Sequence, residues 1–474
     1  MKSTKIVCTI GPASQSEEVL KKLVAAGMDV ARINMSHGSY NFHKATIDSI
    51  RKVSIKTGKF IGILLDLQGP KIRTGKQKKE VIELIKGHEL KLTTDDIVGN
   101  WEMLSINYKP LPEEAKPGEK ILLDDGNIEL RIVKIENKII TCEVMNGGMI
   151  RAFRGINLPD TPLSTPALTQ KDLEDLDFGL ANDVDFVALS FVRKAEDIIN
   201  LRKIILGKGK NAFIISKIEK PEAITNIDRI IEESDGIMVA RGDLGAETSA
   251  EDVPILQKQI IHKCNIAQKP VITATQMMES MITKPKPTRA EANDVANAIF
   301  DGTDAVMLSG ETAMGEYPVE TVTVMSNIAQ RTEKEINYTE ITEKLYNLSG
   351  KAEDDADALC YSACTLCNTI SPKYMVGFSR SGRTIEALSK YRPSKPILGM
   401  SPDERILRRL SVFRGVYGIK IEMAESSDEL FDNTNKILTA RGFCTKGDKV
   451  VAVSSMPLTG INRTNMIKIH TIDT

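Results

Sequence analysis

Two acidic residues follow neighbouring apolar runs of the sequence, at points where a metal ion could be held. Glu219 ends the run FIISKIE, and Asp243 follows the next run, GIMVA. Mg²⁺ and Mn²⁺ prefer oxygen ligands, and Mg²⁺ commonly takes one or two carboxylates together with water and substrate oxygens. The pair therefore predicts a divalent-metal site with open coordination positions. The simpler alternative is that the carboxylates form ion pairs with neighbouring bases, namely Lys217, Lys220 or Arg241.

Basic residues occupy similar positions and predict an anion site. Four of them end or follow apolar runs: Arg32, Arg73, Lys217 and Arg241. Together they can bind a phosphate or a carboxylate, although the chain has a formal net charge of only −1. Phosphoryl transfer uses this combination, because its catalysis is mostly positioning and neutralisation of phosphoryl oxygens by a metal and cations. The sequence contains no Walker A motif, so we do not expect a P-loop to bind nucleotide.

Eight short apolar runs are the elements that must position these residues. They begin near Lys5, Asp29, Phe60, Asp185, Phe213, Gly236, Pro270 and Ala305. Each is almost continuously hydrophobic, as is typical of parallel strands covered on both faces. Apart from one long gap, their starts lie about 23 to 35 residues apart, which leaves room for a helix between successive strands. The count favours a (β/α)₈ barrel, and an open doubly wound sheet is the alternative.

Helix-start signals lie between the runs. Capping boxes, in which a hydroxyl residue is followed three positions later by an acid, are predicted at three places: Ser14 with Glu17, Thr169 with Asp172, and Thr288 with Glu291. Apolar residues at helical spacing follow each box. The alternation of strands and helices supports the barrel prediction.

The long gap and the end of the chain predict two further domains. We expect an α/β protein made of a TIM barrel at residues 1–70 and 167–335, an all-β lid domain at 71–166 inserted after strand 3 as a small β-barrel, and a C-terminal α/β domain at 336–474. Alternating hydrophobicity with turn signals at Asp125-Gly126, Asn137 and Gly147-Gly148 indicates the β domain. The polar stretch after Glu335 is predicted to be a linker.

In a TIM barrel the carboxyl ends of the strands surround one cavity. The polar residues that would meet there are Arg32, Asn34, Ser36, His37, Asp66, Arg73, Ser190, Lys217, Glu219, Arg241, Asp243, Thr275, Ser309 and Glu311. His37 is interpreted equally well as a hydrogen-bonded loop residue and as a nucleotide contact. The predicted site is therefore a mouth that combines carboxylates, cations and hydroxyls.

The C-terminal domain carries a second candidate anion site. SRSGRT follows an apolar run and precedes a helical stretch, and its residues form a possible phosphate cradle: Ser379, Arg380, Ser381, Gly382, Arg383 and Thr384. An ordinary turn with a helix cap is the alternative. A nearby stripe of cysteines, Cys360, Cys364 and Cys367, contains C-x-x-C but no second pair or histidine, so we predict core packing instead of zinc binding.

Composition excludes several classes of protein. With 63 Lys+Arg and 64 Asp+Glu, the chain has no overall field to attract nucleic acid or an anionic membrane. The amino terminus has no signal-peptide pattern, and no apolar stretch is long enough to span a bilayer. Seven scattered cysteines suit a reducing compartment. We expect a cytoplasmic protein of several domains.

The motifs together resemble the pyruvate kinase family. They occur in order as TKIVCTIGPAS, ARINMSHG, LLDLQGPKIRTG, RGINLP, ISKIE, GIMVARGDLG, ATQMMESM and PTRAEANDVANAIFDGTDAVMLSGETA. The resemblance runs to about Pro318 and continues more loosely to the end. It implies the same three-domain fold, transfer of the phosphoryl group of phosphoenolpyruvate to ADP to give pyruvate and ATP, a phosphorylated allosteric effector and a homotetramer.

Residue roles follow from matching positions in that family. The resemblance implies Mg²⁺ or Mn²⁺ on Glu219 and Asp243, and Lys217 on the transferring phosphoryl group and the developing enolate. The substrate would be bound by Arg32, Arg73, Ser190, Lys217, Thr275 and the segment Ala240, Arg241, Gly242 and Asp243. The nucleotide would contact Asn34, Ser36, His37, Arg73 and Arg154. Thr275, Ser309 and Glu311 would lie where a relay could deliver a proton to enolpyruvate.

The sequence departs from the family pattern at the monovalent-cation site. Asn34, Ser36 and Asp66 match the residues that hold K⁺ in potassium-requiring members, but Lys71 stands where those members carry Glu. Its ammonium could replace K⁺, so we predict activity without added K⁺. Thr74 speaks against this, because potassium-independent relatives tend to be aliphatic there. Arg154 replaces a Lys that usually precedes G-[VI]-N-L-P.

Two other functions are kept as alternatives. A metal-dependent lyase or aldolase acting on pyruvate or its enolate could use the same carboxylate pair, but it has no phosphate that would require the cations. A catalytically silent binding protein is the non-enzymatic alternative. In the C-terminal domain, SSMPLTGINRTN departs from the pattern of members that respond to sugar bisphosphates, so the identity of the effector is left open.

Overall fold

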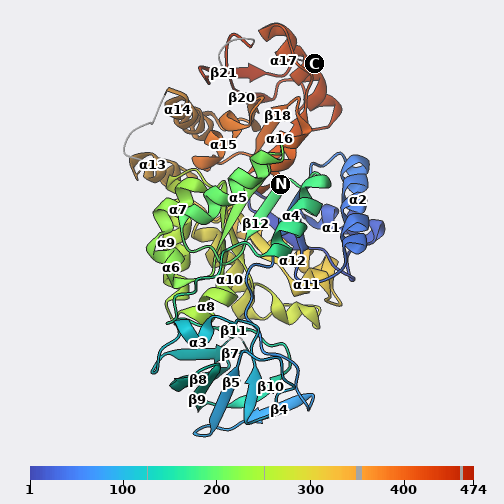
Figure 1. Ribbon diagram of the computed structural model, residues 1–474. Coiled ribbons are helices and arrows are strands. Elements are labelled where there is room, and N and C mark those ends of the chain that lie inside the picture. The colour runs from blue at the N-terminus through green and yellow to red at the C-terminus, as the bar shows by residue number, and fades with distance from the viewer. Residues whose placement is uncertain (125, 250, 349–354, 459–462, 474) are drawn as a thin grey trace.

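A computed structural model describes residues 1–124, 126–249, 251–348, 355–458 and 463–473. Figure 1 shows a helix-covered barrel in the middle, a β-rich domain at one end and an α/β domain at the other. The predicted α/β class and three-part architecture are confirmed. The predicted boundaries at 70/71, 166/167 and 335/336 stay a prediction.

The central sheet is a closed parallel barrel of all eight predicted strands. They are β1 (Lys5–Thr9), β2 (Val30–Asn34), β3 (Gly62–Asp66), β12 (Phe186–Leu189), β13 (Phe213–Ile218), β14 (Gly236–Ala240), β15 (Val271–Ala274) and β16 (Ala305–Leu308), and β1 pairs with β16. Along β1, Val7 belongs to the cluster inside the barrel, whereas Ile6 and Cys8 belong to the cluster beneath the helices. Burial on both faces explains the continuous apolar runs, and closure excludes the open sheet.

Helices surround this barrel. They are α1 (Glu17–Ala26), α2 (Tyr40–Thr57), α4 (Gln170–Ala181), α5 (Ala195–Gly207), α6 (Pro221–Thr225), α7 (Ile227–Glu233), α8 (Arg241–Glu247), α9 (Val253–Ile266), α10 (Arg289–Phe300), α11 (Gly310–Ala313) and α12 (Pro318–Glu333), with a 3₁₀ turn at Glu279–Ile282. The capping boxes at Thr169 and Thr288 are confirmed. The box at Ser14 is wrong, because Ser16 caps α1 and Ser14 Oγ accepts a bond from Gly11 N instead.

The amino end of the barrel is built on an aspartate in front of every second strand. Asp29, Asp185, Asp235 and Asp304 directly precede β2, β12, β14 and β16. The carboxylate of each accepts the N–H of a residue in a neighbouring strand, at 3.0 Å from Ile6, 2.9 Å from Ile63, 2.8 Å from Ile214 and 3.1 Å from Val271. These carboxylates, three of them buried and that of Asp235 half-buried, satisfy strand-end donors.

The inserted domain lies beyond the carboxyl ends of the strands (Figure 1). Its six-stranded sheet has the order β11 (Ile156–Asn157), β7 (Lys120–Leu123), β8 (Ile128–Glu136), β9 (Ile139–Asn146), β5 (Glu89–Thr93) and β6 (Met103–Ser105), and β10 (Gly148–Arg151) pairs with β4 (Val81–Leu84). A short helix, α3 (Leu111–Glu114), accompanies them. Residues Arg73 and Thr74 form β-bridges with Gly155, next to β11, and with Ile106, next to β6. The small β-barrel stays a prediction, and we call this β domain the lid. Asp125, one of the predicted turn residues, lies outside the described residues.

The C-terminal domain begins with a helix where a linker was predicted. Helix α13 (Tyr338–Leu348) covers part of that stretch, because Thr342 and Leu345 bury one face of it; residues 349–354 lie outside the described residues. The five-stranded sheet has the order β19 (Val416–Lys420), β18 (Ile397–Ser401), β17 (Tyr374–Phe378), β20 (Lys449–Ser454) and β21 (Met466–Thr471), with only β21 antiparallel. Its helices are α14 (Asp355–Ile370), α15 (Arg383–Lys390), α16 (Glu404–Arg409) and α17 (Ser427–Ala440), with a 3₁₀ turn at Leu410–Val412. The predicted core packing of Cys360, Cys364 and Cys367 is confirmed, since all three are buried.

Candidate active site

A cavity of about 140 Å³ lies at the mouth of the barrel, between the strand ends and the first crossing into the lid. The predicted residues that line it are Arg32, Asn34, Ser36, His37, Asp66, Arg73, Ser190, Lys217, Glu219 and Asp243, together with Lys71. They come from β2 and the turn after it, from β3, from β13 and the residue after it, from the turn after β12, from the first turn of α8, and from the lid crossing. The structure therefore brings together most of the predicted mouth residues.

Lys217 is held at the centre of this cavity by three oxygens. Its Nζ lies 2.8 Å from Glu219 Oε1 and 3.4 Å from Asp66 Oδ1, and it donates to Ser190 Oγ at 2.8 Å. Burial lowers the pKa of Lys217, but the carboxylates of Asp66 and Glu219 outweigh burial and hold the pKa above its usual value. Lys217 therefore carries a fixed positive charge.

Glu219 and Asp243 suit a divalent metal. Glu219 is only 1 % exposed, and burial raises its pKa against the effect of Lys217, with Asp243 as a second negative charge nearby. Two carboxylates confined in this way favour a cation between them. No three His, Cys, Asp or Glu side chains gather into a metal cluster in the described parts of the chain, so water and substrate would complete the coordination. The ion-pair alternative is also seen, between Glu219 and Lys217.

The predicted monovalent-cation residues meet beside Lys217. Ser36 N donates to Asn34 Oδ1 at 3.1 Å, and Asp66 pairs with Arg32 at 2.6 Å. Lys71 lines the same cavity, and no ion pair is recorded between it and any described residue. Asp66 keeps a pKa below its usual value because Lys217 and Arg32 outweigh the effect of burial. Cations of the chain itself therefore surround this carboxylate.

The predicted nucleotide residues lie partly on the lid. Arg73 forms a β-bridge with Gly155, next to Arg154, whose side chain lies 3.4 Å from Asp124 and is 45 % exposed. Arg154 does not line the cavity, and its backbone N–H donates to the hydroxyl of Thr74. Burial, with Arg73 and Lys71 nearby, lowers the pKa of His37. His37 is thus a neutral ring in a cationic setting at neutral pH.

Thr275 has the backbone conformation of a constrained residue. Its φ is +67°, which is unusual for a β-branched side chain, and Gln276 follows at +54°. Thr275 Oγ1 accepts the N–H of Gly242 at 2.8 Å and donates to Ala274 O at 2.6 Å. The hydroxyl therefore ties the end of β15 to the turn after Ala240.

Arg241 lies apart from the other predicted cations. Its guanidinium pairs with Asp294 at 2.7 Å and donates to the carbonyl oxygens of Ala274 and Thr275. It does not line the mouth cavity. Backbone carbonyls and a carboxylate from neighbouring elements hold it, and position in the sequence alone could not reveal them.

Ser309 and Glu311 form a local unit at the end of β16. Glu311 is 3 % exposed and accepts the N–H groups of Ser309 at 2.7 Å and Met278 at 3.2 Å. Burial raises the pKa of Glu311, although these backbone donors oppose the rise. Neither residue lines the mouth cavity.

Comparisons with known proteins identify this arrangement. Residues 1–322 match the family model "Pyruvate kinase, barrel domain", and residues 357–470 match "Pyruvate kinase, alpha/beta domain". The chain belongs to the pyruvate kinase family. A pyruvate kinase of Clostridium perfringens is 44% identical over 474 residues, covering 100% of both chains, and one of Sporosarcina psychrophila is 44% identical over 477 residues, covering 100% of this chain and 81% of the other.

A solved structure agrees with these relatives. A pyruvate kinase from Cryptosporidium parvum superposes with a TM-score of 0.94 at 38% identity, covering 99% of this chain and 96% of the other. The three-domain architecture is thus that of a pyruvate kinase. The lyase or aldolase alternative is not favoured, because the whole chain matches one family of phosphotransferases.

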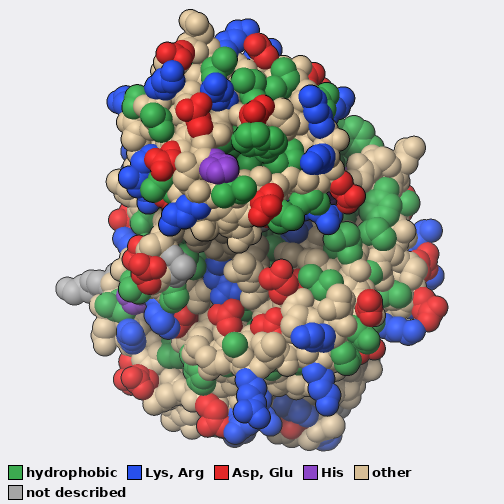
Figure 2. All heavy atoms as spheres, turned by 90° about the horizontal axis from the view of Figure 1, so that it is seen from below, with side chains coloured by type: hydrophobic (Ala, Val, Ile, Leu, Met, Phe, Trp, Pro, Cys, Tyr) green, Lys and Arg blue, Asp and Glu red, His purple; other side chains and the backbone are tan. Residues whose placement is uncertain are grey.

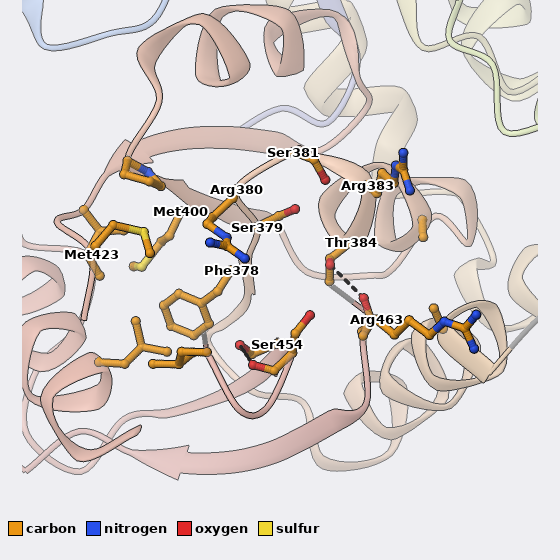
Figure 3. Close-up of a pocket in the computed structure, with 18 of the residues that line it drawn as sticks. Phe378, Ser379, Arg380, Ser381, Arg383, Thr384, Met400, Met423, Ser454 and Arg463 are labelled. Atoms are coloured by element: carbon orange, nitrogen blue, oxygen red, sulfur yellow. Dashed lines mark hydrogen bonds between the residues drawn. The ribbon is translucent and has the colours of Figure 1, made fainter. Parts of the chain in front are cut away.

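The predicted effector loop of this pyruvate kinase lines the largest cavity described, about 760 Å³. Ser379, Arg380 and Ser381 follow β17, and Gly382, in the left-handed conformation, caps α15 (Figure 3). Arg463 and Ser454 line the opposite wall, and the Thr384 and Thr464 hydroxyls lie 2.8 Å apart. The loop is therefore part of a cavity with cationic walls; residues 459–462 of SSMPLTGINRTN lie outside the described residues.

Some active-site contacts were not foreseen from the sequence. Phe191, at φ +53°, donates its backbone N–H to Glu219 Oε2 at 2.7 Å, and Thr9 accepts from Arg32 at 2.9 Å. A backbone donor carries no side-chain signal, and Thr9 lies in an ordinary apolar run.

In the described parts of the chain, no helix has both the length and the apolar character needed to cross a membrane. Seen from the lid end, positive and negative side chains are interspersed (Figure 2).

Proposed function

We propose that this pyruvate kinase transfers the phosphoryl group of phosphoenolpyruvate to ADP at the mouth cavity. The observation that carries the proposal is the buried ammonium of Lys217, fixed among Asp66, Ser190 and Glu219 in a cavity that Arg73 also lines. The enolate oxygen leaves phosphorus while a β-phosphate oxygen of ADP bonds to it. Lys217 and Arg73 neutralise charge on the phosphoryl oxygens during this exchange.

Glu219 and Asp243 would hold the divalent metal, Mg²⁺ or Mn²⁺. When bound, the metal supplies positive charge to the substrate and phosphoryl oxygens. The residues of this chain do the positioning: Phe191 N–H and Lys217 fix the Glu219 carboxylate, and α8 carries Asp243. The backbone from Ala240 to Asp243 would bind the substrate carboxylate.

Enolpyruvate must then gain a proton on carbon to become pyruvate. Thr275, with its hydroxyl at the end of β15, would deliver this proton, and Ser309 and Glu311 would supply it through water. Burial raises the pKa of Glu311, which favours a carboxyl group that can hold a proton.

A coupled assay tests the reaction. Purified protein with Mg²⁺, phosphoenolpyruvate and ADP should form pyruvate and ATP in equal amounts, and pyruvate formation should stop when ADP is omitted. Pyruvate released from a hydroxy-keto acid without ADP would support the lyase or aldolase function instead.

We further propose that Lys71 takes the place of K⁺. Activity should persist in potassium-free buffer containing a tetramethylammonium salt. Lys71→Glu should lose most activity in that buffer and regain it with KCl, whereas Lys79→Glu, on the exposed lid surface, should behave as wild type. Loss of nearly all wild-type activity without K⁺ would contradict the proposal, and Thr74 would then be the residue to examine.

We propose a phosphorylated effector at Ser379–Thr384, in a cytoplasmic homotetramer. The cradle residues, with Arg380 and Arg383 in the same cavity, suit a phosphate group. The buried free cysteines suit a reducing compartment. Light scattering tests the tetramer, and a panel of sugar phosphates and nucleotides should shift half-saturation by phosphoenolpyruvate in wild type but not in Arg383→Ala.

A further inference from the structure

Three buried polar side chains meet where the lid returns to the barrel. Asn157 lies on β11 of the lid, Lys220 directly precedes α6, and Glu247 ends α8. Their exposed fractions are 8, 6 and 5 %. Glu247 Oε1 accepts from Asn157 Nδ2 at 2.7 Å and from Lys220 Nζ at 2.5 Å. We call these three residues the hinge cluster; Figure 1 shows α8 beside β11 at this junction.

Each member lies within four residues, along the chain, of a residue of the candidate active site or of its β-bridge partner. Lys220 is the residue after Glu219, and Glu247 lies one helical turn beyond Asp243 on α8. Asn157 lies two residues beyond Gly155, the bridge partner of Arg73. The hinge cluster therefore connects both candidate metal carboxylates with the lid segment that carries the predicted nucleotide contacts.

Burial of these polar groups costs free energy, which is unusual for a purely structural contact. Glu247 Oε2 is buried and has no hydrogen-bond partner among the described residues, and Glu247 lines a cavity of about 30 Å³ with Lys71 and Asp243. A buried charge pair adds little stability over apolar packing, so geometric specificity is a better reason to keep it. Here the geometry concerned is the position of the lid relative to the carboxylates.

The two crossings between barrel and lid are held differently. On the return crossing, the Arg193 guanidinium donates to the carbonyl oxygens of Leu163 and Thr165, next to the hinge cluster. The outgoing crossing is held at Gly69, whose N–H donates to Asp172 at 3.0 Å. Beyond it, Lys71 and Arg73 form no ion pair with any described residue. The return crossing is therefore the side of the lid that charged side chains of the barrel hold in place.

We propose that Asn157, Lys220 and Glu247 are positioning residues that form the hinge of the lid and fix its position against the metal carboxylates. The proposal rests on the proposed function, since it assigns ADP to the lid side and the metal to Glu219 and Asp243. Loss of the lid contact should weaken ADP binding selectively. Loss of the Lys220 contact should also weaken the metal site.

Asn157→Leu tests the lid contact, because it removes the amide at similar volume. We expect the KM for ADP to rise about tenfold, the value of one hydrogen bond to a charged group, with the KM for phosphoenolpyruvate within twofold of wild type. Asn146→Leu, on β9 of the same lid sheet but outside the cluster, is the matched control, because it also loses one amide hydrogen bond. An equal change in both KM values would overturn the proposal.

Lys220→Met and Lys220→Arg test the metal side without relying on turnover. Mn²⁺ affinity, measured by electron paramagnetic resonance, should fall at least fivefold in Lys220→Met and recover in Lys220→Arg. A lower melting temperature with unchanged Mn²⁺ affinity and unchanged KM for ADP would overturn the proposal. Because Mn²⁺ binding is read without catalysis, failure of the hinge is distinguishable from failure of the proposed reaction.

Discussion

The two ends of the barrel both carry many charges, but only one end uses nearly all of them within the fold. At the amino end, Asp304 binds Arg392 through both oxygens, at 2.5 and 3.0 Å, and Asp185 binds Arg51 and Arg408. At the mouth, Lys71 and Arg73 have no recorded ion pair with any described residue, and Glu219 is held with a raised pKa.

The difference separates stabilising charges from functional ones. Arg392 and Arg408 come from the C-terminal domain, so their ion pairs also join that domain to the barrel. At the mouth the same residue types are left ready to bind an anion and a metal. Charge that is unsatisfied within the fold therefore indicates function better than the number of charged residues does.

Removing one cation from the mouth should produce the largest effect. Lys217→Met should lower kcat about 10³- to 10⁴-fold in a protein that still folds, because a fixed charge on the phosphoryl oxygens is lost. The coupled assay measures kcat, and circular dichroism measures folding. Lys59→Met, which removes a cation beside Asp29 at the amino end, is the matched control and should lower the melting temperature but retain kcat. Similar kcat values for Lys217→Met and wild type would contradict the claim that the charges at the mouth are functional.

Removing one cation from the amino end should instead reduce stability. Arg392→Met leaves Asp304 buried without its guanidinium, which should cost about 3 kcal/mol, because Val271 N–H still donates to the carboxylate. Thermal unfolding should show this, with kcat of the folded protein unchanged. Lys263→Met, in an exposed pair with Asp228, should change stability by less than about 0.5 kcal/mol. If Arg392→Met lowered kcat as much as Lys217→Met does, the two ends of the barrel would not differ in function as described.

A smaller effect is expected from Glu386, a carboxyl of α15 near the amino end. Burial, with Asp235 nearby, raises the pKa of Glu386 from 4.5 to about 7, although Arg383, Arg409 and Lys269 oppose the rise. Between these two values the folded chain binds more protons than the unfolded chain, so this group's contribution to stability is full below pH 4.5 and falls until about pH 7. Glu386→Gln should therefore raise the melting temperature more at pH 8 than at pH 5. An equal difference at both pH values would contradict the pKa assignment.

The barrel was predictable because its signals are local. Continuous apolar runs identify buried parallel strands, and the polar residues after them mark the mouth, as Lys217 and Glu219 illustrate. Thr169 and Thr288 were correct as caps for the same reason, since both partners lie within three residues.

Other features depend on contacts made across the fold, which the sequence does not reveal. Arg241 resembles the other cations in sequence, but Asp294, 53 residues later, binds it elsewhere. Helix α13 is polar except for the face packed on its own domain, so the stretch resembled a linker. In the hinge cluster, Glu247 contacts Lys220 and Asn157, which lie 27 and 90 positions away in the sequence, and no local pattern predicts such contacts.

Barrel closure also has a consequence for the order of folding during synthesis. Lys5 pairs with Ala305, so the first strand cannot find its second neighbour until some 300 residues have been made. The lid pairs only with itself, between Val81 and Asn157, and its sheet contacts are complete long before that point. We expect the lid to fold while the barrel is still open on the ribosome, and the final joining of β1 to β16 to be the slow step, as it is for pairings of high sequence separation.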